Sequence, residues 1–269
     1  MDIVSLLVLG LVQGITEWVP ISSKTQVTFV YLTFFKGTLG SVVPILLYAH
    51  VGTFLAATLY FRKEIACLVR SIREKPFDVG CHANGKAGFL FTALLFTGLV
   101  GVPLLLLEKK FFPTFEAGFL YAIMGLGLII TGILLLSHKG EKTRTTEEVT
   151  WKDGVLTGLL QGLSSLPGIS RSGTSTTGLI WRGFDSESSF YLSFFLSIPT
   201  VFFAEILLYV GGGLTPFPVT DGVILLLTSF IVGYLTLDGL LKLVKKVNIA
   251  YLVLALGIII ITVGLSGIG

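Results

Sequence analysis

The chain has 269 residues, of which 53% are hydrophobic and 13% charged, and its formal net charge is only +3. A mean hydropathy of +0.89 leaves more apolar surface than the core of a soluble domain can bury, so we predict one integral-membrane domain covering residues 1–269. The small net charge argues against nucleic acid as a partner. Cys67 and Cys81 lack the spacing of a zinc site and are expected to be free thiols.

The first predicted element, residues 2–36, is apolar but is interrupted midway by the polar motif QGITEWVPISSKT at 13–25. Neither half is long enough to cross a bilayer, which takes about 20 residues. Such a polar break is tolerated at membrane depth only where it lines a cavity or is buried in protein. We therefore expect a re-entrant helix-turn-helix hairpin.

Three apolar runs of spanning length follow, at 41–60, 87–107 and 117–137. The charged stretches 62–86 and 137–151 are expected to be solvated loops. A second interrupted segment, 153–183, contains QGLSSLPGISRSGT at 161–174 and is predicted to form a second re-entrant hairpin. Three further spans are expected at 188–210, 221–241 and 249–267.

The two polar motifs begin 148 residues apart and share their order of Gln, Gly, turn and hydroxyl cluster, which indicates an internal repeat. Repeat one covers 1–137, repeat two covers 153–269, and a cytoplasmic loop at 138–152 joins them. Each repeat is a hairpin followed by three spans. Because three is odd, the second hairpin must enter from the opposite side. The predicted fold is an all-α polytopic membrane protein with an inverted-topology repeat, six transmembrane helices and two re-entrant hairpins.

Loop charges predict the orientation, because Lys and Arg accumulate on the cytoplasmic side of short loops. One side carries only Lys36, Lys109 and Lys110. With the richer side in the cytoplasm of a cell membrane, both termini lie outside, the hairpin tips meet near the midplane, and the site opens outward. The richer side carries fourteen residues: Arg62, Lys63, Arg70, Arg73, Lys75, Lys86, Lys139, Lys142, Arg144, Lys152, Arg182, Lys242, Lys245 and Lys246.

The second tip, PGISRSGT at 167–174, places Arg171 among hydroxyl and backbone donors where a helix begins. A helix N-terminus with an Arg fork is suited to a phosphate or diphosphate. In the first tip, Glu17 faces this cradle, and a structural ion pair between Glu17 and Arg171 is the alternative interpretation. The expected substrate-binding residues are Gln13, Ser22, Lys24 and Gln26 in the first tip and Ser170, Ser172, Gly173 and Thr174 in the second.

These motifs resemble the undecaprenyl-pyrophosphate phosphatase family, also called the bacitracin-resistance family. The likeness covers nearly the whole chain and rests on PGISRSGT, on the later segment FYLSFFLSIP at 190–199, and on Gly14, Thr16, Glu17, Pro20, Ser22 and Ser23. It implies removal of the terminal phosphate from a polyprenyl diphosphate, recycling a lipid carrier used to export cell-wall sugars. It also implies dependence on Mg²⁺ or another divalent cation, with Glu17 as the ligand if the protein supplies one.

The chain departs from the family pattern at three places, so it looks like a divergent member. Gln13 stands in place of a glutamate, Lys24-Thr25 in place of Thr-Gly, and Gln26 in place of a histidine. An amide cannot act as a base near neutral pH, so two groups that the family uses are neutral here. Lys24 is expected to supply positive charge in their place.

The resulting hypothesis makes Arg171, Glu17 and Ser23 the catalytic residues. Arg171 and the adjacent N–H groups hold the terminal phosphate, and Glu17 acts as the base. Glu17 either deprotonates Ser23 as nucleophile or activates water; the residues leave both routes open. His50 lies about ten residues into the first full span, near mid-depth, and either replaces the missing histidine or packs against a backbone carbonyl. Glu205, which follows Pro199, is expected to face a cavity.

Two other functions fit the same pattern. Broken helices that meet at the midplane of an inverted repeat are also typical of secondary transporters, so a polyprenyl-phosphate flippase or anion carrier is the main alternative. An inactive binding relative is the second. The 32 glycines suit close helix packing in lipid and permit a homodimer without requiring one.

Overall fold

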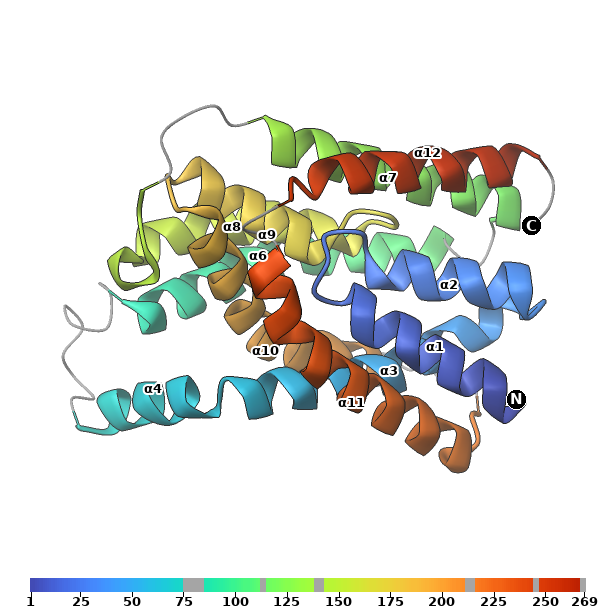
Figure 1. Ribbon diagram of the computed structural model, residues 1–269, viewed down its shortest axis with the longest axis horizontal. Helices are drawn as coiled ribbons and strands as arrows, with labels where there is room; N and C mark the ends of the chain where they lie inside the picture. Colours follow the sequence, from blue (N-terminus) through green and yellow to red (C-terminus); the bar gives the residue numbers. More distant parts are fainter. Residues whose placement is uncertain (75–84, 112–114, 138–142, 211–215, 244–246, 267–269) are drawn as a thin grey trace.

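The computed structural model describes residues 1–74, 85–111, 115–137, 143–210, 216–243 and 247–266. These residues form eleven α-helices and two short 3₁₀-helices, with no β-strand among them, which confirms the predicted all-α membrane fold. Helices are numbered as in Figure 1.

Both interrupted segments form helix-turn-helix hairpins, as predicted. The first pairs α1 (Ile3–Thr16) with α2 (Ser23–Phe34), and the second pairs α8 (Trp151–Gly162) with α9 (Arg171–Trp181). The longest of these helices has 14 residues, or about 21 Å, which is less than the roughly 30 Å of a bilayer core. In Figure 1 the hairpins enter from opposite ends of the molecule, and their turns face each other near its middle.

Within the described residues, five other helices are long and apolar enough to span a membrane, where six were predicted. The sixth, α12 (Ala250–Leu265), has only 16 residues, or about 24 Å, because its helix ends before residue 267. The five are α3 (Leu39–Tyr60), α6 (Lys86–Phe111), α7 (Ala117–Leu136), α10 (Ser186–Val210) and α11 (Val219–Leu243).

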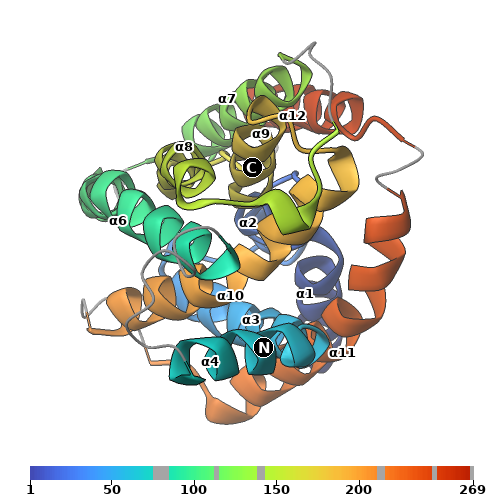
Figure 2. The same cartoon turned by 90° about the vertical axis from the view of Figure 1, so that its left-hand side faces the viewer.

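The first helix of each hairpin packs against a helix from the other half of the chain. α1 packs against α11, and α8 packs against α6, so the first helix of each hairpin contacts the second long helix of the other half (Figures 1 and 2). Glycines allow this close approach: a Cβ on Gly10 would lie 2.7 Å from Thr228 Cβ, and one on Gly162 would lie 2.6 Å from Val100 Cβ. This reciprocal arrangement is what an inverted repeat requires.

The helices α7 and α12 lie side by side at one edge of the molecule (Figures 1 and 2). They run antiparallel, since Gly118 approaches Gly264 while Gly125 approaches Gly257. A Cβ on Gly125 would lie 2.6 Å from the Gly257 carbonyl oxygen, which is too close for any side chain. Small residues therefore bring these two backbones together, as is common between helices in lipid.

The stretch that begins at Arg62 is a helix rather than the expected solvated loop. Helix α4 (Arg62–Glu74) continues the direction of α3 beyond the helical bundle in Figure 1. Ile65 and Leu68 pack against the central core, while Val69 is exposed. Apolar residues at helical spacing thus override the local charge density. Cys67 on α4 is an exposed free thiol, as expected, and Cys81 lies outside the described residues.

The turn between α8 and α9 depends on Gly168, whose φ of +86° is in the left-handed region. A Cβ there would lie 2.6 Å from Met124 Cα. We expect Gly168→Ala to lower the free energy of unfolding by about 2 kcal/mol or more, through backbone strain and displacement of α7. Thermal unfolding of the purified protein in detergent measures this effect. Gly239→Ala is the matched control, because a Cβ on Gly239 meets nothing within 4 Å. Equal midpoints for the two variants would contradict this account of the turn.

Candidate active site

The two hairpin tips contact each other directly, as the sequence predicted. Arg171, the first residue of α9, places Nη2 2.5 Å from Glu17 Oε1, at the end of α1. Beside this ion pair, Ser172 Oγ donates to the Val19 carbonyl at 3.1 Å. Gly173 is required at the contact, since a Cβ there would lie 3.2 Å from Pro20 Cβ and closer still to the methyl group of Thr131.

Glu17 is the centre of the first tip and is 6% exposed. Its Oε2 accepts hydrogen bonds from Ser23 Oγ at 2.7 Å and from Gln13 Nε2 at 2.8 Å, while Arg171 occupies Oε1. A hydroxyl that donates to a buried carboxylate has the geometry of a nucleophile beside its general base. Gln13 is fully buried and orients the carboxylate.

The turn between α1 and α2 directs the Ser23 side chain toward Glu17. Ser22 adopts a left-handed conformation with φ 58°, which costs a non-glycine residue about 1–3 kcal/mol. Thr25 Oγ1 donates to Ser22 Oγ at 3.0 Å, and Gln26 Nε2 donates to the Ile21 carbonyl at 2.9 Å. Ser22 and Gln26 therefore hold the turn in the position that the Ser23–Glu17 bond needs.

In the second tip, most hydroxyl groups bond to backbone. Ser170 caps α9 by accepting from the Gly173 N–H at 3.3 Å, and its own N–H donates to Thr131 Oγ1 at 3.1 Å. Thr174 Oγ1 donates to the Ser170 carbonyl at 3.0 Å. Arg171 Nη1, by contrast, is buried and has no hydrogen-bond partner among the described residues. This donor and the backbone N–H groups of Arg171 and Ser172, which precede the capped N–H of Gly173, are the ones suited to a phosphate oxygen.

Lys24 is placed differently from the expectation that it replaces lost positive charge at the phosphate. Its ammonium forms an ion pair with Glu108 of α6. The Glu108 side chain is 7% exposed, so this carboxylate needs a cation beside it. The charge of Lys24 is therefore offset within the protein.

His50 of α3 lies beside the tips, as its position along the span suggested. Its Nε2 lies 3.6 Å from Glu17 Oε2, and its Nδ1 lies 3.2 Å from Glu205 Oε1 on α10. The ring thus faces two carboxylates rather than a backbone carbonyl. The sequence signalled a cavity near Glu205, but it gave no sign that His50 and Glu205 are partners.

The residues around Glu17 offer few ligands for a divalent cation. Both carboxylate oxygens of Glu17 are engaged by protein donors. Among the residues that the structure covers, no group of three or more His, Cys, Asp or Glu side chains could hold a metal ion. The donor set therefore does not fit a cation held by Glu17.

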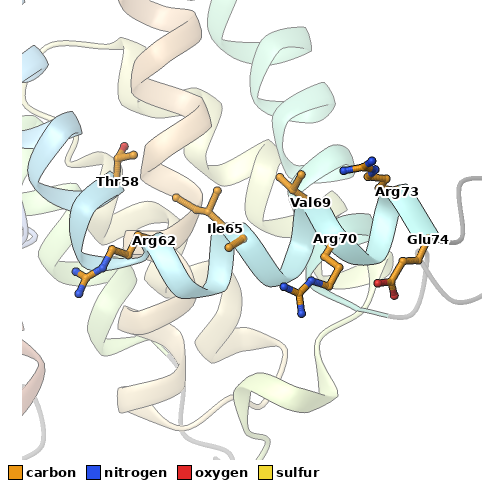
Figure 3. A pocket seen from close by; sticks show the side chains of 8 residues that line it. Thr58, Arg62, Ile65, Val69, Arg70, Arg73 and Glu74 are labelled. Carbon is orange, nitrogen blue, oxygen red and sulfur yellow. The ribbon is translucent and has the colours of Figure 1, made fainter.

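A pocket of about 650 Å³ lies away from the tips, along one side of α4 (Figure 3). None of the tip residues lines it. The chemical site is defined instead by the hydrogen bonds and ion pairs between the tips, which bring an acid, a hydroxyl and a guanidinium together. The lining residues are Thr58, Arg62, Ile65, Ala66, Val69, Arg70, Arg73 and Glu74.

Comparison with known proteins agrees with this geometry. Residues 6–262 match a family model described as bacitracin resistance protein BacA. An undecaprenyl-diphosphatase of Methanococcoides burtonii is 35% identical over 257 residues, covering 94% of this chain and 95% of the relative. An undecaprenyl-diphosphatase of Haloarcula marismortui is 35% identical over 241 residues, covering 90% and 89%. One of Methanopyrus kandleri is 33% identical over 260 residues, covering 96% and 94%.

Proposed function

Because this chain belongs to the bacitracin-resistance family, we propose that it is a membrane phosphatase that converts a polyprenyl diphosphate of the undecaprenyl type to the monophosphate and inorganic phosphate. The observation that carries the proposal is the 2.7 Å hydrogen bond from Ser23 Oγ to Glu17 Oε2, beside Arg171. This arrangement joins a nucleophile, a base and a phosphate-binding cation at the contact between the tips.

In the proposed reaction, Arg171 and the N-terminus of α9 bind the terminal phosphate. Ser23 Oγ forms a bond to its phosphorus, the bond to the polyprenyl phosphate breaks, and the Ser23 proton passes to Glu17 Oε2. Water then hydrolyses the phosphoserine, giving its hydroxyl to phosphorus and a proton to Ser23 Oγ, and Glu17 releases the proton that it took from Ser23. The Ser23–Glu17 bond favours this route over direct activation of water by Glu17.

The other tip residues support these three. Gln13 orients Glu17, and Ser22 and Gln26 hold the turn that carries Ser23. Contact of the substrate with Lys24, Ser170, Ser172, Gly173 and Thr174 stays a prediction. Dependence on Mg²⁺ or another divalent cation also stays a prediction, which activity after treatment with EDTA tests, and so does a homodimer.

The positions of charged residues and of the helix ends support the orientation in the membrane that the sequence predicts. In Figure 1 the N-terminus and the end of α12 at Leu265 lie on the same side of the molecule. Helix α4, which carries Arg62, Arg70 and Arg73, lies toward the other end. The positive-inside rule supports placing this end in the cytoplasm, with both termini outside and the site open to the outer side.

The experiment that separates a phosphatase from a carrier compares detergent with liposomes. Phosphate release from a polyprenyl diphosphate by the purified protein in detergent is the expected result, since hydrolysis needs no second compartment. Translocation of the lipid head group across liposomes without phosphate release would instead support a carrier.

We expect Ser23→Ala to lower kcat by at least about 10³-fold, because the attacking oxygen is lost. A rapid acid quench of the wild-type protein, followed by mass spectrometry, should detect phosphoserine at Ser23. Ser266→Ala is the matched control, since Ser266 is exposed and its Oγ donates to the carbonyl of Val263, near the end of α12. Full turnover in Ser23→Ala would show that Glu17 activates water directly.

A further inference from the structure

His50 is held between two carboxylates that come from different parts of the chain. Its Nε2 lies 3.6 Å from Glu17 Oε2, and its Nδ1 lies 3.2 Å from Glu205 Oε1. The side chains of His50 and Glu205 are 18% and 14% exposed, so both are largely enclosed by protein. Four side chains therefore lie in a row, in the order Ser23, Glu17, His50 and Glu205.

Glu205 has few ways to offset its charge. Its Oε2 is buried and has no hydrogen-bond partner among the described residues, and its Oε1 faces the imidazole. An ionised carboxylate inside a membrane helix needs a cation or a hydrogen-bond donor. The Nδ1–H of His50 supplies that donor, and this assignment leaves Nε2 as the proton acceptor that faces Glu17.

We propose, on the basis of the phosphatase function above, that His50 and Glu205 form a proton-accepting pair behind Glu17. As Ser23 attacks phosphorus, its proton moves to Glu17 Oε2 and from there to His50 Nε2. Glu205 is a positioning residue that fixes the ring and stabilises the imidazolium. His50 then releases the proton before the next turnover, and Glu17 returns to the carboxylate form that the next turnover needs.

The charges around the imidazole support this role. Glu17 and Glu205 stabilise an imidazolium, and Arg171, which is paired with Glu17, opposes it. The two carboxylates, one guanidinium and one imidazolium sum to zero after the proton has moved. Proton transfer to His50 therefore leaves the buried cluster without net charge, which favours the transfer at membrane depth.

The test measures phosphate release in detergent by His50→Gln, Glu205→Gln and the double variant. We expect His50→Gln to lower kcat by about 10²-fold with KM changed by less than about twofold. Glu205→Gln should lower kcat by about tenfold, and the double variant should be no slower than His50→Gln, because the two residues act as a unit. Added imidazole should restore part of the turnover of His50→Ala. Thr58→Val is the control, since Thr58 Oγ1 bonds to its own helix at Phe54.

Each outcome decides between the proposals. No phosphate release by the wild-type protein would overturn the phosphatase function and this inference with it. An active wild type with an unchanged kcat in His50→Gln would overturn the inference alone. If the decrease in kcat of the double variant equals the product of the two single decreases, and imidazole does not rescue His50→Ala, both residues act in helix packing and the inference is overturned. Thermal unfolding shows whether each variant is folded, and Glu205→Gln keeps the test decisive if His50 variants fail to fold.

Discussion

Arg171→Ala is expected to lower kcat/KM for phosphate release by about 10³-fold, or roughly 4 kcal/mol of transition-state stabilisation. The guanidinium is the only cation paired with Glu17 from the second tip, and its Nη1 is a buried donor without a partner among the described residues. Its removal takes away the group that offsets charge on the transferred phosphate. The initial rate of phosphate release by the purified variant measures the loss.

The control for this variant is Arg73→Ala, which removes an exposed guanidinium near the end of α4. Its rate should equal that of the wild-type protein, because α4 lies away from the tips. Arg171→Ala with the wild-type rate would contradict the role of Arg171, whatever the effect of the substitution on stability.

Glu17→Gln is expected to lower kcat by about 10³-fold, within the range of general-base catalysis. Glutamine has the same shape but cannot accept the Ser23 proton, so phosphoserine should not accumulate after mixing with substrate. Rapid-quench measurements separate this step from later ones. Glu116→Gln is the control, since Glu116 is exposed at the start of α7. A Glu17→Gln protein that forms phosphoserine at the wild-type rate would contradict the assignment of the base.

The hairpins and the contact between their tips could be predicted because the chain contains two polar motifs inside apolar segments. Each of these motifs must be buried in protein or line a cavity. A polar motif with Pro and Ser cannot face the lipid of a bilayer. The two such motifs, at 13–25 and 161–174, are therefore expected to share one site. The same reasoning located Glu17 opposite Arg171, which the structure confirms. The depth of His50 followed from counting helical rise along its span.

Pairs of residues from distant segments could not be predicted in this way. Lys24 pairs with Glu108, 84 positions away, and nothing near Lys24 in the sequence indicates that partner. The pairing of His50 with Glu205 likewise depends on how α3 and α10 pack. In each case hydropathy shows that a charged residue inside the membrane needs a partner. Which residue that partner is depends on how the helices pack.

Two elements differ from prediction because charge and hydropathy alone determine neither the face of a charged helix nor the end of an apolar one. The stretch from Arg62 to Glu74 is rich in charge and suggested a loop, yet Ile65, Leu68 and Ile72 recur at helical spacing. Helix α12 is continuous in hydropathy up to residue 267 but ends at Leu265, which makes it shorter than a full span. Hydropathy alone sets neither a helix end nor the face on which a charged helix packs.

The most direct test of the account is kcat of Arg171→Lys. Lysine keeps the positive charge and the ion pair with Glu17, but it lacks the planar fork that binds Glu17 and a phosphate oxygen together. If Arg171 acts on the transferred phosphate, kcat for phosphate release should fall by at least about 10²-fold while the protein stays folded. If the pair only stabilises the contact between the hairpins, Arg171→Lys should release phosphate at the wild-type rate, and that result would contradict the account.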